Sequence, residues 1–155
     1  MSEYTATVRW ARDGAGFTDH KYSRAHSWTF DGGLTVPAAA SPHIVAPSVT
    51  AEAAVDPEEA FVASLSSCHM LWFLSIAAGH GLVVDRYEDR AVGLLGRNAD
   101  GRLAMLEVTL QPAVAFAGTA PSAAELEALH ARAHEACFIA NSVKTKVTVR
   151  VASSE

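Results

Sequence analysis

The chain contains two cysteines, Cys68 and Cys137, which are far apart in sequence and form no CxxC motif. Neither a thioredoxin-type redox motif nor a zinc ribbon is therefore indicated. Two thiols that a fold brings together can act as a peroxidatic and a resolving pair: one thiolate attacks a peroxide O–O bond, becomes a sulfenic acid, and condenses with the second thiol to a disulfide. The alternative is that both are small buried hydrophobic side chains, as most intracellular cysteines are.

A reactive thiol needs a nearby cation or helix N-terminus. Glu58 is a candidate partner for Cys68, but it lies ten residues earlier. Along one helix this is about 15 Å of rise and a rotation about 80° away from the same face, so the two side chains cannot touch within one chain. If two copies of the helix packed antiparallel about a two-fold axis, one N-terminus could approach the Cys68 of the other copy. Glu58 is otherwise a favourable first-turn carboxylate.

Histidines offer a second chemistry. His130, His134 and Cys137 fall at i, i+4 and i+7 of a predicted helix, and Cys68 could supply a fourth ligand for a metal ion. Helical histidines are more often solvated or part of the core, so this metal site is the weaker hypothesis. His69 follows Cys68 directly but points about 100° away from it on a helix, so the two form no Cys–His dyad.

A long helix is predicted over residues 56–79. Asp56 is a good N-cap, Pro57 suits the first helical position, and the glutamates that follow favour the positive end of the helix dipole. Apolar side chains repeat at helical spacing at Phe61, Leu65, Cys68 and Trp72. The opposite side of this helix is not polar either, so we expect the helix to be covered from more than one side.

The remaining periodicity predicts strands and a second helix. Strands are expected over residues 4–10, 27–30, 34–36, 82–89, 91–95, 103–110 and 143–151. Alternation in the first of these predicts that one of its faces is buried. A capping box at Ser122–Glu125 opens a helix that runs to about Cys137. This order predicts an α+β fold, with sheet packed on helices.

Composition limits the classes of function. The chain has 155 residues, of which 50% are apolar and 19% charged, and its net charge is −5. We expect one domain over residues 1–155, and no nucleic-acid partner because no basic field is present. No apolar run approaches the ~18–20 residues needed to span a bilayer, so no membrane segment is expected. The N-terminus lacks the pattern of a secretory signal, and the expected location is cytoplasmic.

Two segments carry a resemblance to a known family. Residues 56–69, with the sequence DPEEAFVASLSSCH, resemble the first cysteine motif of the OsmC/Ohr family, the osmotically inducible and organic-hydroperoxide-resistance proteins. Residues 133–143, AHEACFIANSV, resemble the second motif. The best-known members follow the second cysteine with proline, whereas Phe138 stands here, so the CFIANS pattern indicates a less characterised branch.

The resemblance implies an OsmC-like α+β fold, in which curved antiparallel sheets wrap around central helices in an intertwined homodimer with active sites at the interface. It implies a thiol-dependent peroxidase in which Cys68 attacks the peroxide and Cys137 resolves. The family's catalytic glutamate corresponds to Glu58, acting across the interface. The family's arginine corresponds to Arg24, with Arg12 as the alternative. Such an arginine would pair with Glu58 and stabilise the thiolate.

The substrate and the reductant are inferred less directly than the fold and the cysteine roles. An apolar pocket is expected from Phe61, Leu65, Trp72, Phe138 and Ile139. It would favour a bulky organic hydroperoxide over hydrogen peroxide. No resident cofactor is expected, and the resemblance implies an external thiol or dithiol reductant, such as a lipoylated protein. The rival hypothesis is a non-enzymatic protein that binds a lipid-like or thiol ligand in the apolar interface pocket.

Overall fold

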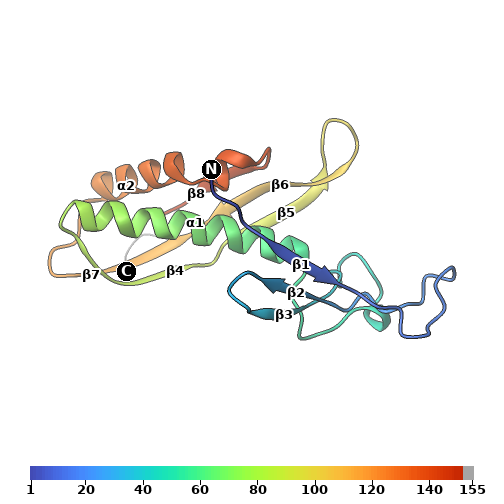
Figure 1. The fold of residues 1–155 in the computed structure, drawn as a ribbon. Helices are drawn as coiled ribbons and strands as arrows, with labels where there is room; N and C mark the ends of the chain where they lie inside the picture. The colour runs from blue at the N-terminus through green and yellow to red at the C-terminus, as the bar shows by residue number, and fades with distance from the viewer. Residues whose placement is uncertain (152–155) are drawn as a thin grey trace. The chain divides into compact units, whose positions relative to one another are not determined.

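The computed structural model of the chain describes residues 1–151. The chain divides into two compact units, Met1–Ala60 and Phe61–Glu155. Figure 1 labels the elements, whose bounds are β1 (Ala6–Arg9), β2 (His26–Phe30), β3 (Thr35–Ala38), η1 (Pro47–Val49), α1 (Pro57–Gly79), β4 (Val83–Asp89), β5 (Val92–Arg97), β6 (Leu103–Leu110), β7 (Pro112–Ala117), α2 (Ala123–Ala136), η2 (Ala140–Ser142) and β8 (Lys146–Val149).

The first unit holds an antiparallel sheet in the order β1-β2-β3. The hairpin between β2 and β3 turns at Gly33, whose φ of 83° lies in the left-handed region that glycine adopts without strain. All four residues of β1 are exposed in this chain. The prediction that one face of this strand is buried is therefore wrong for the single chain.

A long antiparallel ribbon forms the framework of the second unit. β4 pairs with β7 and β5 pairs with β6, and the register continues across the break, since Asp89 lies opposite Pro112 and Val92 opposite Thr109. β8 joins the other side of β6 in parallel orientation. The sheets are thus antiparallel, as expected, except at this last pairing. Sequence reasoning missed β7, because its PAVAFA sequence begins with proline and is rich in alanine, which is a poor strand former.

Two apolar clusters hold the helices against this ribbon. One joins α1 and α2 to β4 and β7, with Phe73 and Leu129 at its centre. The other joins the first half of α1 to β6 and β8, with Leu65, Val108 and Leu110 at its centre. In Figure 1, α2 runs beside α1 along the ribbon. The thiol-bearing middle of α1 lies between these two clusters along the helix.

Both helices begin as the sequence predicts. Asp56 caps α1: its Oδ1 accepts a hydrogen bond from the Glu59 backbone N–H at 2.8 Å, and its own N–H donates to Glu59 Oε2 at 3.3 Å. The same reciprocal capping box opens α2 between Ser122 and Glu125. Caps of this kind stabilise a helix by about 1 kcal/mol each.

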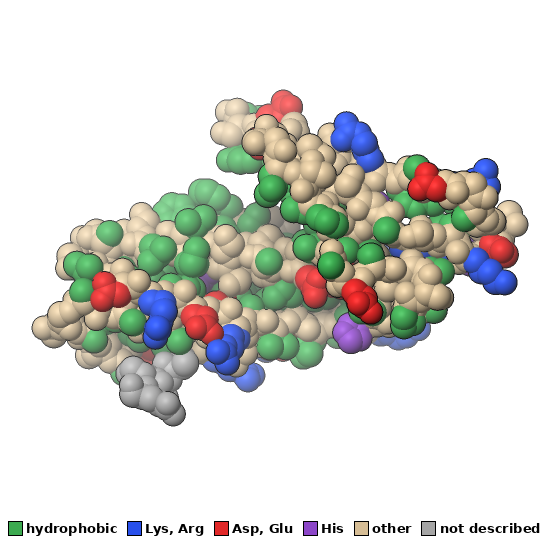
Figure 2. Space-filling view, turned by 90° about the horizontal axis from the view of Figure 1, so that it is seen from below, with side chains coloured by type: hydrophobic (Ala, Val, Ile, Leu, Met, Phe, Trp, Pro, Cys, Tyr) green, Lys and Arg blue, Asp and Glu red, His purple; other side chains and the backbone are tan. Residues whose placement is uncertain are grey.

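One face of α1 is not covered within the chain. Its buried residues are Leu65, His69, Phe73 and Ala77, a single stripe at four-residue spacing. The opposite face presents Leu71 with 61% of its surface exposed. Hydrophobic side chains are exposed elsewhere on the surface as well (Figure 2). The expectation that the helix is covered from several sides is thus not met by the chain alone.

The length and composition of α1 correct one prediction. The helix is long and apolar enough to cross a membrane, although only 22% of its most apolar window is buried. Polar residues such as Ser75 interrupt the apolar run, but they lower the mean hydropathy of the helix too little to change this. A core helix of a soluble protein also meets this criterion, so the finding is weak support for a membrane span.

Candidate functional site

The two cysteines meet where α1 packs on α2. Cys68 is half-buried in the middle of α1, and Cys137 is the C-cap residue of α2 with 1% of its surface exposed. Cys68 lies close enough to Cys137 to raise the pKa of the Cys137 thiol. The fold thus brings together two side chains from opposite ends of the second unit's sequence. The two thiols are free in this structure.

The environment of Cys137 keeps its thiol protonated. Burial, and then the hydrogen bond with Cys68, raises the pKa of Cys137 to about 11. The Ala140 backbone N–H donates to Cys137 Sγ at 3.4 Å and opposes this shift in part. At neutral pH Cys137 is therefore a thiol, and it can act as a nucleophile only if its proton is removed.

A buried histidine pair lies next to the thiols along the same helix–helix contact. His69 of α1 and His130 of α2 are 1% and 2% exposed, and their rings are parallel within 5°. His69 Nε2 and His130 Nδ1 are 3.0 Å apart and share one hydrogen. The His130 ring also stacks on Phe73, with centroids 4.2 Å apart. Sequence reasoning treated these histidines separately and missed the pair. The signal was that His69 continues the stripe of Leu65, Phe73 and Ala77.

The histidine pair leaves polar atoms without partners in the interior. His69 Nδ1, His130 Nε2 and the Nδ1 of His134 are buried and make no hydrogen bond. Whichever ring of the pair donates, one outer nitrogen is an unpaired donor and the other an unpaired acceptor. Each such group costs about 1–3 kcal/mol. A cost of this size in a small core requires an explanation in function or in bound solvent.

Burial also governs the charge of this pair. Burial, and then the charge that His134 would carry, lowers the pKa of His69 to about 4, against the opposing effect of Asp89. Burial, and then His69, lowers the pKa of His130 to about 4. Both rings are neutral at neutral pH, and His134 lies close enough to affect His69.

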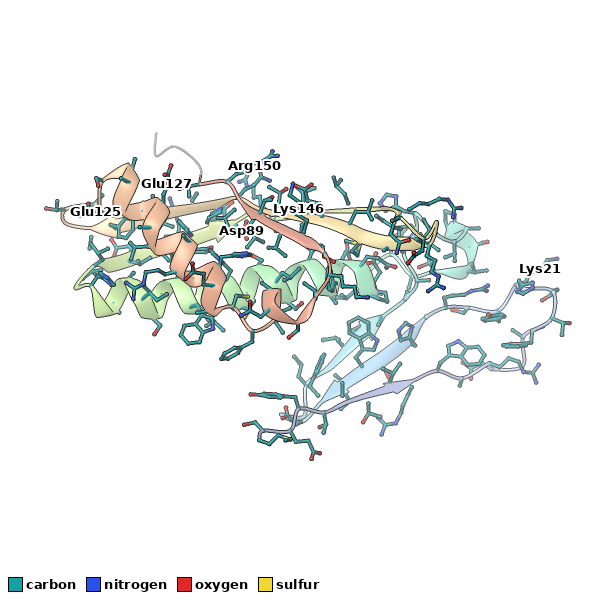
Figure 3. The ribbon with its side chains drawn as sticks, turned by 90° about the horizontal axis from the view of Figure 1, so that it is seen from above. Lys21, Asp89, Glu125, Glu127, Lys146 and Arg150 are labelled. Carbon is teal, nitrogen blue, oxygen red and sulfur yellow. The ribbon has the colours of Figure 1, made fainter. Side chains whose placement is uncertain are left out.

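Asp89 connects the turn of α1 that precedes Cys68 to the ribbon. It lies at the end of β4 (labelled in Figure 3), where its carboxylate accepts a hydrogen bond from Ser66 Oγ and another from the Gln111 backbone N–H at 2.6 Å. Ser66 is two residues before Cys68. The carboxylate thus joins α1 to the ribbon one half-turn before Cys68.

The predicted arginines lie in the first unit. The Arg24 guanidinium stacks 3.8 Å above the Tyr22 ring, and its Nη1 donates to the carbonyl oxygens of His20, at 2.7 Å, and Tyr22. Arg12 is exposed and donates to the Ala15 carbonyl at 2.6 Å. Arg24 is half-buried and makes more contacts than Arg12.

Glu58 is half-buried in the first turn of α1, as predicted. Among residues 1–151 the ion pairs are Arg90–Glu88 and Lys146–Glu107. Within the described chain, Glu58 therefore forms no ion pair with Arg24. Whether it does so across two copies stays a prediction.

The expected apolar pocket is partly filled by the core. Leu65 is fully buried, and Phe61 and Ile139 pack against it, so these three side chains contribute to the core. Trp72 and Phe138 pack edge to face, with ring centroids 5.4 Å apart. Phe138 is 67% exposed and follows Cys137 directly. This aromatic pair is the part of the predicted pocket that borders the thiols.

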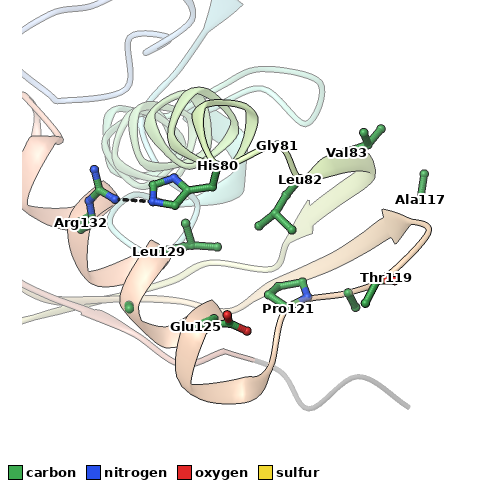
Figure 4. A pocket seen from close by; sticks show the side chains of 12 residues that line it. His80, Gly81, Leu82, Val83, Ala117, Thr119, Pro121, Glu125, Leu129 and Arg132 are labelled. Carbon is green, nitrogen blue, oxygen red and sulfur yellow. Dashed lines mark hydrogen bonds between the residues drawn. The ribbon is translucent and has the colours of Figure 1, made fainter.

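A separate pocket of about 640 Å³ opens where α1 ends (Figure 4). It is lined by His80, Gly81, Leu82, Val83, Ala117, Thr119, Ala120, Pro121, Glu125, Ala128, Leu129 and Arg132. Arg132 Nη1 donates to His80 Nε2 at 2.8 Å, while His80 Nδ1 donates to the Ile76 carbonyl. Neither cysteine lines this pocket, so it is distinct from the thiol site.

The histidine–cysteine metal site finds no support. Within residues 1–151, no group of three or more His, Cys, Asp or Glu side chains is arranged to hold a metal ion. His130, which that hypothesis used as a ligand, instead directs Nδ1 at His69.

Comparisons with known proteins agree with this architecture. The family described as OsmC-like protein matches residues 50–152. An OsmC-like protein of unknown function from Vibrio cholerae O1 biovar eltor is 55% identical and superposes with a TM-score of 0.96, over 98% of this chain and 100% of the other. None of the curated proteins compared with the chain matches it.

More distant solved structures share the fold. The organic hydroperoxide resistance protein from Elizabethkingia anophelis is 18% identical, with a TM-score of 0.73 over 99% of this chain and 98% of that one. OhrB of Bacillus subtilis is 19% identical, with a TM-score of 0.71 over 97% and 98%. The fold and the paired thiols define an α+β protein of the OsmC/Ohr type. The chain belongs to the OsmC-like family.

The histidine pair predicts a pH dependence of stability. An unfolded histidine has a pKa of 6.5, whereas His69 and His130 have pKa values of about 4 in the folded chain. Between these values the unfolded chain binds more protons, so stability should fall as the pH decreases from about 6.5 to about 4. Denaturant unfolding at a series of pH values measures this.

A double variant, His69→Gln with His130→Gln, should lose most of this dependence. His80→Gln, at an exposed position, should retain it. Equal pH slopes for the double variant and the wild type would contradict the account.

Proposed function

We propose that this protein is a thiol-dependent peroxidase that reduces organic hydroperoxides through Cys68 and Cys137. The observation that carries the proposal is the proximity of the two thiols, one half-buried and one fully buried, where α1 packs on α2. The half-buried thiol has access to a peroxide, and the buried thiol is next to the sulfur it must attack. The organic hydroperoxide resistance proteins with this fold support the choice of substrate.

The reaction divides between the two cysteines. The Cys68 thiolate attacks the outer peroxide oxygen, the O–O bond breaks, and the alkoxide leaves as an alcohol after taking a proton, which oxidises Cys68 to a sulfenic acid. The Cys137 sulfur then attacks Cys68 Sγ, an S–S bond forms, and the hydroxyl group leaves as water. An external thiol or dithiol supplies the two electrons that return both cysteines to thiols.

A second copy of the chain would complete the site. The uncovered face of α1 carries small side chains at helical spacing, which allow a second helix to approach closely, and the exposed Leu71 among them. These residues are Ala63, Ser67, Ser75 and Ala78. In an antiparallel arrangement the partner's first turn would bring a second Glu58 toward Cys68, with Arg24 as its ion-pair partner. The proposed active unit is therefore a homodimer.

The entrance to the thiols favours an apolar substrate. Trp72 and Phe138 present aromatic surface beside Cys68 and Cys137. A bulky organic hydroperoxide would bury apolar area against these rings, at about 25 cal/mol per Å², whereas hydrogen peroxide would not.

The second candidate function is a non-enzymatic binding protein for a lipid-like or thiol ligand. The burial of Cys137 and its raised pKa favour this alternative, because such a thiol is unreactive by itself. Slow alkylation of both native thiols, without a peroxide-induced disulfide, would select it.

The cysteine variants should separate the two steps. Cys68→Ser should lose essentially all consumption of cumene hydroperoxide in the presence of dithiothreitol, a loss of at least about a hundredfold, because the attacking sulfur is gone. Cys137→Ser should react once and accumulate Cys68 sulfenic acid, which dimedone traps.

The double substitution Cys68→Ser with Cys137→Ser is the matched control for thiol content. Full hydroperoxide consumption by Cys68→Ser would exclude the mechanism.

The uncovered face of α1 gives a test of the dimer. Leu71→Glu should leave the fold of the single chain intact, because the side chain is 61% exposed, but should shift the protein toward monomer in sedimentation velocity. It should also lower peroxidase activity, since Glu58 would no longer reach the partner's Cys68.

Ala131→Glu, on the exposed side of α2, should change neither property. A wild-type protein that sediments as a monomer, or a Leu71→Glu dimer, would contradict the proposed arrangement.

A further inference from the structure

The structure contains a polar column that the cysteine chemistry described above does not use. Between α1 and α2, side by side with the thiol pair, lie His69, His130 and His134. Three of their ring nitrogens are buried and have no hydrogen-bond partner. The surroundings are otherwise apolar, with Phe73, Leu129 and Ala133 among the buried residues.

The column is adjacent to both sulfurs. His69 follows Cys68 on α1, and His134 precedes Cys137 by one helical turn. Residues three apart are neighbours on a helix surface, so His134 and Cys137 lie on neighbouring positions at the C-terminal end of α2. His134 is only half-buried, which leaves the column a route to solvent.

We propose that these three histidines form a proton-transfer site for the thiols, in which His134, supported by the His69–His130 pair, takes the proton of Cys137 as that thiol attacks Cys68. The inference rests on the part of the proposed function that makes Cys137 the attacking thiol. It does not depend on the identity of the peroxide or of the reductant.

The step balances within the site. The S–H bond of Cys137 breaks and its proton passes to the free Nδ1 of His134, while the sulfur forms an S–S bond with Cys68. The S–O bond of the Cys68 sulfenic acid breaks, and the departing hydroxide takes the proton from the imidazole and leaves as water. The imidazole thus carries the same number of hydrogens before and after the step.

The chemistry requires such a base. A thiol with a pKa of about 11 is rarely ionised at neutral pH, so attack by unassisted Cys137 would be slow. The His69–His130 pair stays neutral and can hold its shared hydrogen on either ring, so it can respond to the charge on His134.

The remaining titratable groups do not offer an equivalent path. The groups that face the column are Cys68 and His69 on α1, His130 and Cys137 on α2, and Tyr87 and Asp89 on β4. Asp89 is occupied by hydrogen bonds from Ser66 and Gln111. Burial, and then Asp89, raises the pKa of Tyr87, so this phenol is no base.

A disulfide probe tests the step without a peroxide. Dithiodipyridine reacts with Cys68, forms a mixed disulfide and releases one thiopyridone; attack by Cys137 on that mixed disulfide then releases a second. The rate of the second release should depend only weakly on pH in the wild-type protein between about pH 6 and pH 8, because the histidine supplies the base. The two releases are resolved by absorbance in stopped flow.

His134→Gln should slow the second release by at least about tenfold at neutral pH and leave the first release unchanged. Its rate should rise about tenfold per pH unit and approach the wild-type rate at high pH, where Cys137 ionises by itself. His80→Gln, a surface histidine on α1's C-terminal side, is the matched control and should behave as the wild type.

Three outcomes would overturn the inference: an unchanged second release in His134→Gln, a slowing that is the same at every pH, or a wild-type rate that itself rises tenfold per pH unit. The last needs no variant, so misfolding of His134→Gln would not prevent a decision. Release of only one thiopyridone would show that Cys137 does not attack the mixed disulfide, and this would also overturn the inference. A normal second release in a protein that consumes no hydroperoxide would contradict the proposed function alone.

Discussion

The contact between α1 and α2 is the constraint on which the rest of this structure depends. It places Cys68 against Cys137 and, at the neighbouring position, His69 against His130. Apolar clusters on either side of these cysteines and histidines hold the helices to the ribbon. Asp89 joins the turn of α1 before Cys68 to the ribbon. The unpaired ring nitrogens of the histidines lower the stability of the folded chain, which is expected of a site kept for its chemistry rather than for stability.

The same arrangement leaves α1 incomplete. Four of its 23 residues are fully buried, and the face of small residues around Leu71 has no cover within the chain. A second copy that covers this face would bury Leu71 and bring charged first-turn residues to the thiols. Stability and reactivity would then depend on one interface, because the chain provides sulfur in the middle of α1 and the supporting charge in the first turn of the same helix.

Local sequence signals predicted much of the fold. The Asp56 N-cap, the capping box of α2, the bounds of α1 and most strands follow from residue types within a few positions. Strand β7 and the parallel pairing of β8 with β6 could not be predicted from local residue types, because their stability comes from neighbours distant in sequence. The contact of the two cysteines was anticipated as one outcome of folding. The histidine pair was missed because angles within one helix say nothing about what the facing helix contributes.

The central claim is that Cys68 and Cys137 form a redox pair within one chain. The most direct measurement is titration of the reduced protein with cumene hydroperoxide, followed by non-reducing mass spectrometry of the intact chain and of its peptides. The account predicts the loss of two hydrogens per chain at one equivalent, with the fragments around residues 68 and 137 joined by a disulfide. Two free thiols after excess hydroperoxide, or a disulfide only between chains, would contradict it.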